Sequence, residues 1–173
     1  MFFTVVAVVV GCVLMVWCYY CIKTARKLDL MFHQNYDNLI GLSGYIDKNS
    51  KVFTVLNRDL SERQRAALFK LKLPSFQGSV PNRIYCKLIA VHRDEAMGGF
   101  MELEIEEKEY EFRAVSITDL LIHFRSPELG EVRAHRGAFP DVKLNDLHAF
   151  KLRVKKSCYP LYCKYSFYVD WLN

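Results

Sequence analysis

The sequence predicts a single N-terminal transmembrane helix followed by a β-rich domain, either all-β or β-dominated α+β. Three observations lead to this class. Residues 2–22 carry no charged side chain, and many short segments after residue 41 are apolar or alternate apolar with polar residues. One segment, residues 61–72, has a helical pattern with a marked start and stop. We expect about seven or eight strands, arranged as a small closed or partly open barrel; a sheet covered by the helix is the alternative.

The apolar segment from Phe2 to Ile22 is long enough to cross a bilayer. Its 21 residues would form a helix of about 31 Å, against a hydrocarbon core of roughly 30 Å. A cleavable signal peptide or a lipoprotein signal is the competing interpretation. However, no Lys or Arg precedes the segment, and the apolar run continues well past Cys12. A transmembrane helix over residues 2–22 is therefore favoured.

The charges that flank this segment predict its orientation. Three basic residues follow it directly: Lys23, Arg26 and Lys27. Because the α-amino group is the one positive charge before it, the positive-inside rule places the N-terminus outside and the domain in the cytoplasm. Cys86, Cys158 and Cys163 of the domain fit no disulfide-framework spacing, which agrees with a reducing compartment. Cys158 and Cys163 flank a predicted turn. A disulfide between them can therefore form if the domain lies outside.

One face of the span is rich in small residues. It carries Thr4, Ala7, Gly11 and Cys18. Small residues let two membrane helices approach closely, so this face is a candidate for self-association. The competing interpretation is that small residues are simply common in membrane helices.

Residues 23–40 form a basic juxtamembrane neck with helical spacing. Leu28, Phe32 and Leu39 recur on one face, with the basic residues largely opposite. Three structures fit: a helix that continues out of the membrane, one that lies on its surface, and one that packs on the domain. The first and third are favoured, because three basic residues make a thin polar face. Gly41 ends the helical pattern, so the domain is expected to cover residues 41–173.

The first part of the domain is predicted to contain a hairpin, one helix and a buried strand. The strands of the hairpin flank a turn-rich connection and cover residues 45–46 and 52–56. The helix at 61–72 begins with a capping box formed by Ser61 and Gln64 and ends before Pro74. A loop and an apolar strand complete this part, at residues 74–81 and 84–91.

Residues 100–115 predict a second hairpin, with a two-residue turn at Glu107-Lys108. This register pairs Ile105 with Tyr110 and gives the hairpin one apolar face. It also opposes like charges, which is unfavourable: Glu104 with Glu111, and Glu106 with Glu109. We interpret this charged face as a means of keeping an edge strand soluble; a cation site or a docking edge for a basic partner is the alternative.

The cleanest alternation lies at the C-terminus. Residues 117–124 read as strand or helix, and residues 125–140 as loops around one short strand. Residues 150–155 alternate and lead through a turn into a final strand. One face of that strand is predicted to be buried: Leu161, Cys163, Tyr165, Phe167, Val169 and Trp171.

Charge is distributed unevenly along the domain. Residues 58–93 carry a net charge of +6, and residues 94–111 carry −7. Such blocks can bring two protein surfaces together, and the plainer interpretation is two solvated faces of opposite sign. An acidic block beside a mildly basic one argues against a nucleic-acid partner.

No motif that carries a known chemistry is visible in the sequence, so we expect no enzyme activity, no cofactor and no metal. A cationic cluster in a loop is a candidate anion site: Arg133, His135 and Arg136. We expect a single-pass, membrane-anchored binding module, an accessory or scaffold component whose partners are the lipid bilayer and either a protein or further copies of itself. The alternative is a ligand-gated membrane effector whose β-barrel binds a small anion or a nucleotide.

Overall fold

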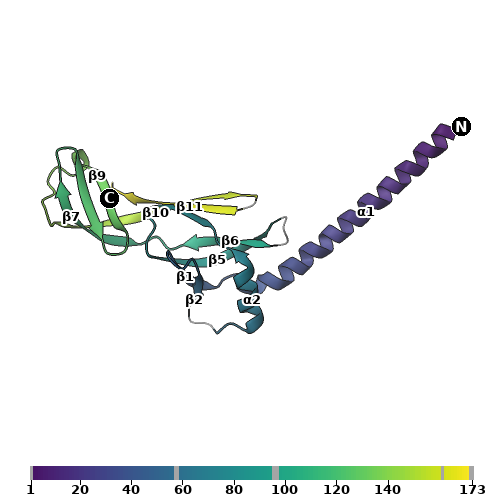
Figure 1. The fold of residues 1–173 in the computed structure, drawn as a ribbon, viewed down its shortest axis with the longest axis horizontal. Helices are drawn as coiled ribbons and strands as arrows, with labels where there is room; N and C mark the ends of the chain where they lie inside the picture. The colour runs from purple at the N-terminus through teal and green to yellow at the C-terminus, as the bar shows by residue number, and fades with distance from the viewer. Residues whose placement is uncertain (1, 57–58, 95–97, 161, 172–173) are drawn as a thin grey trace. The chain divides into compact units, whose positions relative to one another are not determined.

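The computed structural model describes residues 2–56, 59–94, 98–160 and 162–171, with side chains from Val9 onward (Figure 1). The chain divides into two compact units, Met1–Asn38 and Leu39–Asn173. The first unit is essentially one helix, and the second is the β-rich domain. The predicted class, an apolar N-terminal helix before a β-rich domain, is confirmed in these coarse terms.

Helix α1 runs without interruption over Phe2–Tyr36 and is followed by a 3-10 turn, η1, over Asp37–Leu39. Residues 12–40 contain no Gly or Pro, so nothing in this stretch breaks the helix. Gly41 follows with a φ of +91°, a conformation that glycine adopts without strain. The neck therefore continues the apolar segment as one helix.

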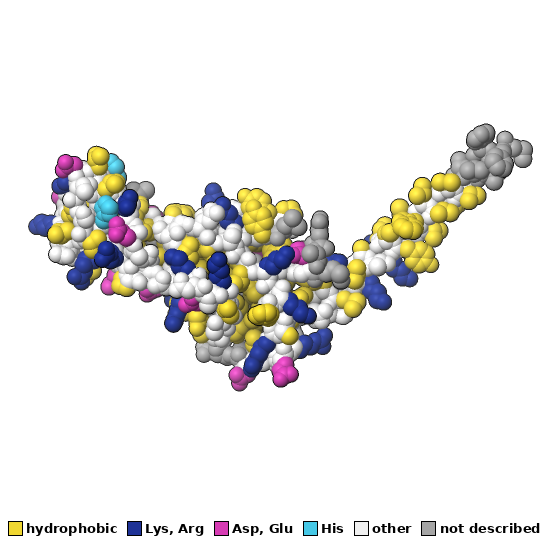
Figure 2. Space-filling model, in the orientation of Figure 1, with side chains coloured by type: hydrophobic (Ala, Val, Ile, Leu, Met, Phe, Trp, Pro, Cys, Tyr) yellow, Lys and Arg dark blue, Asp and Glu magenta, His cyan; other side chains and the backbone are white. Residues whose placement is uncertain are grey.

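The described part of α1 is long and apolar enough to cross a membrane, with a mean hydropathy of 1.3. Figure 2 shows apolar side chains along this helix up to the point where Lys and Arg side chains begin. A signal sequence near an N-terminus meets the same criteria of length and composition. The membrane span and its orientation therefore remain predictions.

The domain contains two curled sheets, each with two open edges, so no closed barrel forms among the described residues. Sheet A has the order β2-β1-β5-β6-β3. Its strands are β2 (Phe53–Val55), β1 (Ser43–Asp47), β5 (Arg83–Arg93), β6 (Gly99–Ile105) and β3 (Leu71–Lys72). Sheet B has the order β4-β11-β10-β7-β8-β9. Its strands are β4 (Ser75–Gly78), β11 (Tyr162–Asp170), β10 (Leu147–Tyr159), β7 (Glu109–Ile117), β8 (Leu121–Ser126) and β9 (Gly130–His135).

These eleven strands exceed the seven or eight that the sequence predicts. Two of the additional strands, β3 and β4, lie where no strand was predicted; they are short and pair parallel with β6 and β11. Strand β4 falls in the segment 74–81 that was expected to be loop. Parallel pairing to a distant strand leaves no hairpin signal in the sequence, so such strands escape pattern reading.

Helix α2 (Glu62–Lys70) begins as predicted. Ser61 is its N-cap, and Gln64 completes the capping box. The predicted end at Lys72 is wrong, because Leu71 and Lys72 form β3 instead. Leu71 pairs with Gly99 and is buried, and this strand pairing ends the helix before Pro74 does.

The predicted hairpin over residues 100–115 is also wrong. Strand β6 belongs to sheet A and β7 to sheet B, so the expected turn is a crossover between the sheets. Glu107 fixes this crossover to β10: its carboxylate accepts hydrogen bonds from Val154 N and Arg153 Nη1, each at 3.2 Å. The like-charge pairs are thereby avoided. Glu104 lies opposite Lys87, and Glu109 lies opposite Lys151.

Aromatic side chains from several strands fill the core of sheet B. Phe112, Phe124 and Phe150 are almost fully buried and contact the ring of Trp171. The predicted apolar face of the final strand is confirmed for its buried members, Cys163, Tyr165, Phe167 and Val169. Leu161 lies outside the described residues. The last strand of the described residues, β11, is therefore part of the core.

Candidate functional site

An apolar groove lies between α2 and the edge of sheet A. Its volume is about 600 Å³, which is within the usual range of ligand pockets. Nine of its twelve lining residues are apolar, among them Phe53, Leu68, Phe69 and Met101. The three polar ones are Lys51, Asp59 and Arg65. The groove is therefore a mainly apolar surface with a few charged groups.

Helix α2 has no buried side chain. Phe69, which lines the groove, is 91% exposed, and Val52 on the sheet side is 52% exposed. A helix of nine residues is too short to be stable alone and normally depends on burying an apolar face. What holds α2 is its capping box, its direct continuation into β3, and a hydrogen bond from Arg65 Nε to Leu60 O at 3.1 Å.

The groove has a basic surround. Helix α2 carries Arg63, Arg65 and Lys70 against one acidic residue, Glu62, and the other two charged lining residues, Lys51 and Asp59, have opposite signs. Apolar lining beside positive charge favours a ligand that combines apolar and acidic groups.

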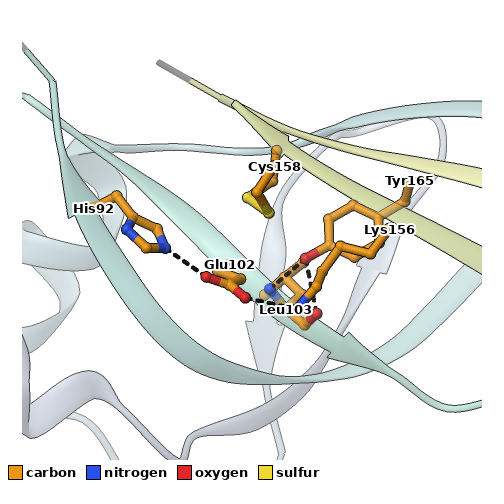
Figure 3. Close-up of a disulfide and its surroundings, with 7 residues drawn as sticks. His92, Glu102, Leu103, Lys156, Cys158 and Tyr165 are labelled. Carbon is orange, nitrogen blue, oxygen red and sulfur yellow. Dashed lines mark hydrogen bonds and ion pairs between the residues drawn. A yellow bond between two sulfur atoms is a disulfide. The ribbon is translucent and has the colours of Figure 1, made fainter. Parts of the chain in front are cut away.

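A disulfide joins the two long C-terminal strands (Figure 3). Cys158 of β10 and Cys163 of β11 lie directly opposite each other in the strand register, with Cα atoms 4.1 Å apart. This close approach is typical of a non-hydrogen-bonded pair. Cys163 is on the buried face of β11 and is 0% exposed, whereas Cys158 is exposed. The two cysteine residues thus differ in exposure, although their sulfur atoms are bonded to each other.

A charged cluster lies next to this disulfide. The carboxylate of Glu102, on β6, lies 2.5 Å from His92 Nε2 and 2.6 Å from Lys156 Nζ. Figure 3 shows these two side chains approaching Glu102 from opposite sides. A Glu102 oxygen and the sulfurs of Cys158 and Cys163 lie within 4.8 Å of one another. Disulfide sulfurs are not thiolates, so in this oxidation state the three groups do not form a metal site.

The charge pattern of the cluster holds Glu102 ionised. Hydrogen bonds from Lys156 and then from His92 lower the pKa of Glu102, and these favourable contacts outweigh its partial burial. Because Glu102 is on sheet A and Lys156 on sheet B, the cluster also links the two sheets.

A buried tyrosine reinforces this link. The hydroxyl of Tyr165 donates to Leu103 O at 2.8 Å and accepts from Leu103 N at 2.7 Å. The side chain is 1% exposed, and burial raises the pKa of Tyr165 to about 12. One hydroxyl therefore satisfies both backbone groups of a residue on the opposite sheet.

The predicted anion cluster is spread over a strand end and a turn. Arg133 and His135 share one face of β9, and Arg136 begins the 3-10 turn η2 (Arg136–Ala138). Nδ1 of His135 accepts from Gly137 N at 3.2 Å, and Nη1 of Arg136 donates to Thr118 O at 3.3 Å. None of these three predicted residues lines a cavity described here, and nothing in the structure tests whether they bind an anion.

The residues predicted to matter in the membrane segment all lie on α1. Cys18 is exposed, and no atom lies within 4 Å of a Cβ added at Gly11. The side chains of Thr4 and Ala7 lie outside the described residues. Lys23, Arg26 and Lys27 are exposed on the same continuous helix. Their roles in self-association and topology stay predictions.

Sequence reasoning missed both the groove and the charged cluster. His92, Glu102 and Lys156 come from three strands and have no motif spacing, so no local signal joins them. The signal that was present is the position of Cys158 and Cys163 on either side of a turn. Comparison with protein-family models, with curated proteins and with solved structures gives no match. The case for a function therefore rests on the geometry of the domain.

Proposed function

We propose that this protein is a single-pass, membrane-anchored binding module whose domain holds a partner protein in the groove beside α2. The observation that carries the proposal is the groove itself: about 600 Å³, mainly apolar, and bordered by a helix with no buried side chain. A short helix with an exposed Phe69 gains stability when a partner covers that side chain.

The composition of the groove defines the class of partner. The apolar lining fits a segment with apolar anchors, and the basic lining residues Lys51 and Arg65 attract acidic residues beside those anchors. The partner is thus a protein that presents an apolar segment flanked by Asp or Glu. Aromatic and apolar residues at the centre of such a contact contribute most of the binding free energy.

The membrane anchor determines where this binding takes place. A helix that crosses the membrane confines the domain to the bilayer surface and raises its effective concentration toward partners in the same membrane. The protein then acts as an accessory or scaffold component that recruits its partner to the membrane.

The test is recovery of a partner from cells by the full-length protein, isolated in detergent after crosslinking. In Phe69→Ser the exposed aromatic of the groove is removed, and we expect recovery to fall by at least about tenfold, the loss of a single central anchor. Leu120→Ser is the matched control, because Leu120 is 67% exposed and is not among the lining residues of the groove.

Partner identity must also fit the proposed class. Mutation of the acidic residues in the recovered partner's apolar segment has to weaken binding, and raised salt has to weaken it further. Equal recovery by Phe69→Ser and Leu120→Ser contradicts the proposal. So does a partner that binds this protein through a surface other than the groove.

A ligand-gated effector that binds a small anion at Arg133, His135 and Arg136 is the second candidate. It is less well supported, because Arg136 already donates to Thr118 O and lies 4.0 Å from Asp119 Oδ1. Thermal unfolding with nucleotides and inorganic phosphate tests it: stabilisation that disappears in Arg133→Ala favours the anion site over the groove.

A further inference from the structure

We propose that the Cys158–Cys163 disulfide is a redox-active site that exchanges with a dithiol, and that Cys158 is the sulfur that is attacked. This inference is independent of the groove and assigns the domain a reaction with thiols. It rests on the unequal exposure of the two cysteines, the polar cluster beside them, and the small structural value of a bond at this position.

Access distinguishes the two sulfurs. Thiol–disulfide exchange needs a thiolate to reach one sulfur while the other leaves. Cys158 is exposed, near the end of the β10–β11 hairpin, whereas Cys163 is 0% exposed. A dithiol therefore reaches Cys158 first, and Cys163 is the leaving group.

The position of the bond argues against a purely structural role. It closes a loop with a sequence separation of 5, and cross-links over short loops restrict the unfolded chain least. Nine register pairs, from Lys151↔Asp170 to Tyr159↔Tyr162, already hold the hairpin together. The strands can thus remain paired after the bond is reduced, as a repeated redox cycle requires.

A charged cluster lies beside the sulfurs, and its ionised carboxylate disfavours a lasting thiolate, so the sulfur that leaves takes up a proton. A Glu102 oxygen lies within 4.8 Å of both sulfurs, and Lys156 and His92 each contact that carboxylate. A cavity of about 360 Å³ is lined by Lys156, Leu103 and Tyr165, which also form or adjoin this cluster. The charged group that lies next to the sulfurs is therefore the Glu102 carboxylate, which is itself bound by Lys156 and His92.

The reaction balances in two steps. One thiolate of the dithiol attacks the sulfur of Cys158, the disulfide bond breaks, and the electron pair goes to the sulfur of Cys163, which takes up a proton. The second thiolate of the dithiol then attacks the dithiol sulfur that is bonded to Cys158, that bond breaks, and Cys158 leaves with the electron pair and takes up a proton from solvent. The dithiol is oxidised to a disulfide, and Cys158 and Cys163 are reduced to thiols by the same two electrons.

The predicted topology agrees with this role. Basic residues after the span predict a cytoplasmic domain. Cytosolic disulfides in most organisms are transient and belong to catalytic or redox-sensing pairs. With the domain in the cytoplasm, as predicted, the Cys158–Cys163 pair would belong to this class.

The first experiment uses the full-length protein in detergent with the cysteines of the span, Cys12, Cys18 and Cys21, replaced by Ala. The oxidised protein is incubated with dithiothreitol or with a cytosol-like glutathione buffer, and free thiols are counted by alkylation and mass spectrometry. We expect two thiols to appear in the native protein, with its thermal unfolding transition retained. A disulfide that withstands both reagents until the domain unfolds overturns the proposal.

The second experiment assigns the attacked sulfur. In Cys163→Ser the remaining Cys158 should react with an aromatic disulfide reagent at least about tenfold faster than Cys163 does in the matched variant Cys158→Ser. Equal rates, or a faster Cys163, overturn the assignment of Cys158. Because the first experiment uses both native cysteines, misfolding of a single variant does not affect its result.

Discussion

Individual side chains connect the two sheets of the domain. Tyr165 donates to and accepts from the backbone of Leu103, and Glu102 binds Lys156 across the same boundary. One edge of β6 is paired with β5, and these contacts occur where its other edge has no strand partner beyond the two positions paired with β3. At this scale, polar side chains take over the backbone pairing that a closed barrel would provide.

Removal of the Tyr165 hydroxyl should therefore destabilise the domain. In Tyr165→Phe, Leu103 N and O lose their partner in a buried position, which costs about 1–3 kcal/mol of unfolding free energy. Tyr168→Phe is the control, because Tyr168 is 51% exposed on the same strand. Denaturant unfolding of the full chain in detergent measures both, and similar losses in the two variants would show that the buried hydroxyl is not important.

Glu102 makes stability depend on pH in the acid range. Hydrogen bonds from Lys156 and His92 lower its pKa in the folded protein below the ordinary 4.5. The stability that this shift contributes is therefore present above pH 4.5 and is lost as the pH falls through the lowered value. Unfolding free energies measured between about pH 6 and pH 3 should fall less steeply in Glu102→Gln. Glu104→Gln, at an exposed position on the same strand, controls for the change in net charge.

At the scale of elements, short strands and tight connections decide how the sheets end. Strand β4 pairs with β11 along its whole length and ends at Gly78, whose φ is +83°. A Cβ at Gly78 would lie 2.1 Å from Phe167 O, whereas a Cβ at Gly130, with a φ of +75°, would meet no atom within 4 Å. The two glycines share a backbone conformation and differ in how closely another strand approaches.

Alanine at these two glycines separates strain from collision. Gly130→Ala should cost about 1 kcal/mol from its positive φ alone. Gly78→Ala should cost at least about 2–3 kcal/mol, because the backbone carbonyl that it meets must move and β4 must separate from β11. Thermal unfolding compares them directly. An equal loss of stability would mean that β4 contributes little to sheet B.

At the scale of the whole molecule, α1 and the domain belong to two separate compact units. The helix provides an apolar segment long enough for a bilayer, and the domain provides the groove and the disulfide. The three basic residues after the span are predicted to keep the domain in the cytoplasm.

This topology can be reversed by charge. Neutral replacements at Lys23, Arg26 and Lys27, together with Lys residues added before Phe2, should move a reporter fused after Asn173 from the cytoplasmic to the external side. Protease or label access to the reporter in intact cells measures this. A reporter that is external in the unaltered protein would contradict the predicted orientation and would make the disulfide an ordinary bond of an oxidising compartment.

Local patterns were sufficient for the apolar helix, the capping box of Ser61, the β1–β2 hairpin and the buried face of β11. Each depends on neighbouring residues, so the sequence contains the whole signal. The hairpin predicted over residues 100–115 failed because Ile105 and Tyr110 have the same alternation whether their strands share a sheet or not. The extension of α2 to Lys72 failed because pairing with Gly99 outweighs helical propensity.

The sequence by itself determined an apolar helix, its basic flank and a β-rich domain that ends in a buried strand. The tertiary structure alone decided that the strands form two open sheets, that α2 borders an apolar groove, and that Glu102 lies beside the disulfide. The physical reason is distance along the chain. Residues 92, 102 and 156 are brought together by strand packing that leaves no periodic pattern in the sequence. The groove exists because its lining surfaces remain uncovered after all the strands have paired.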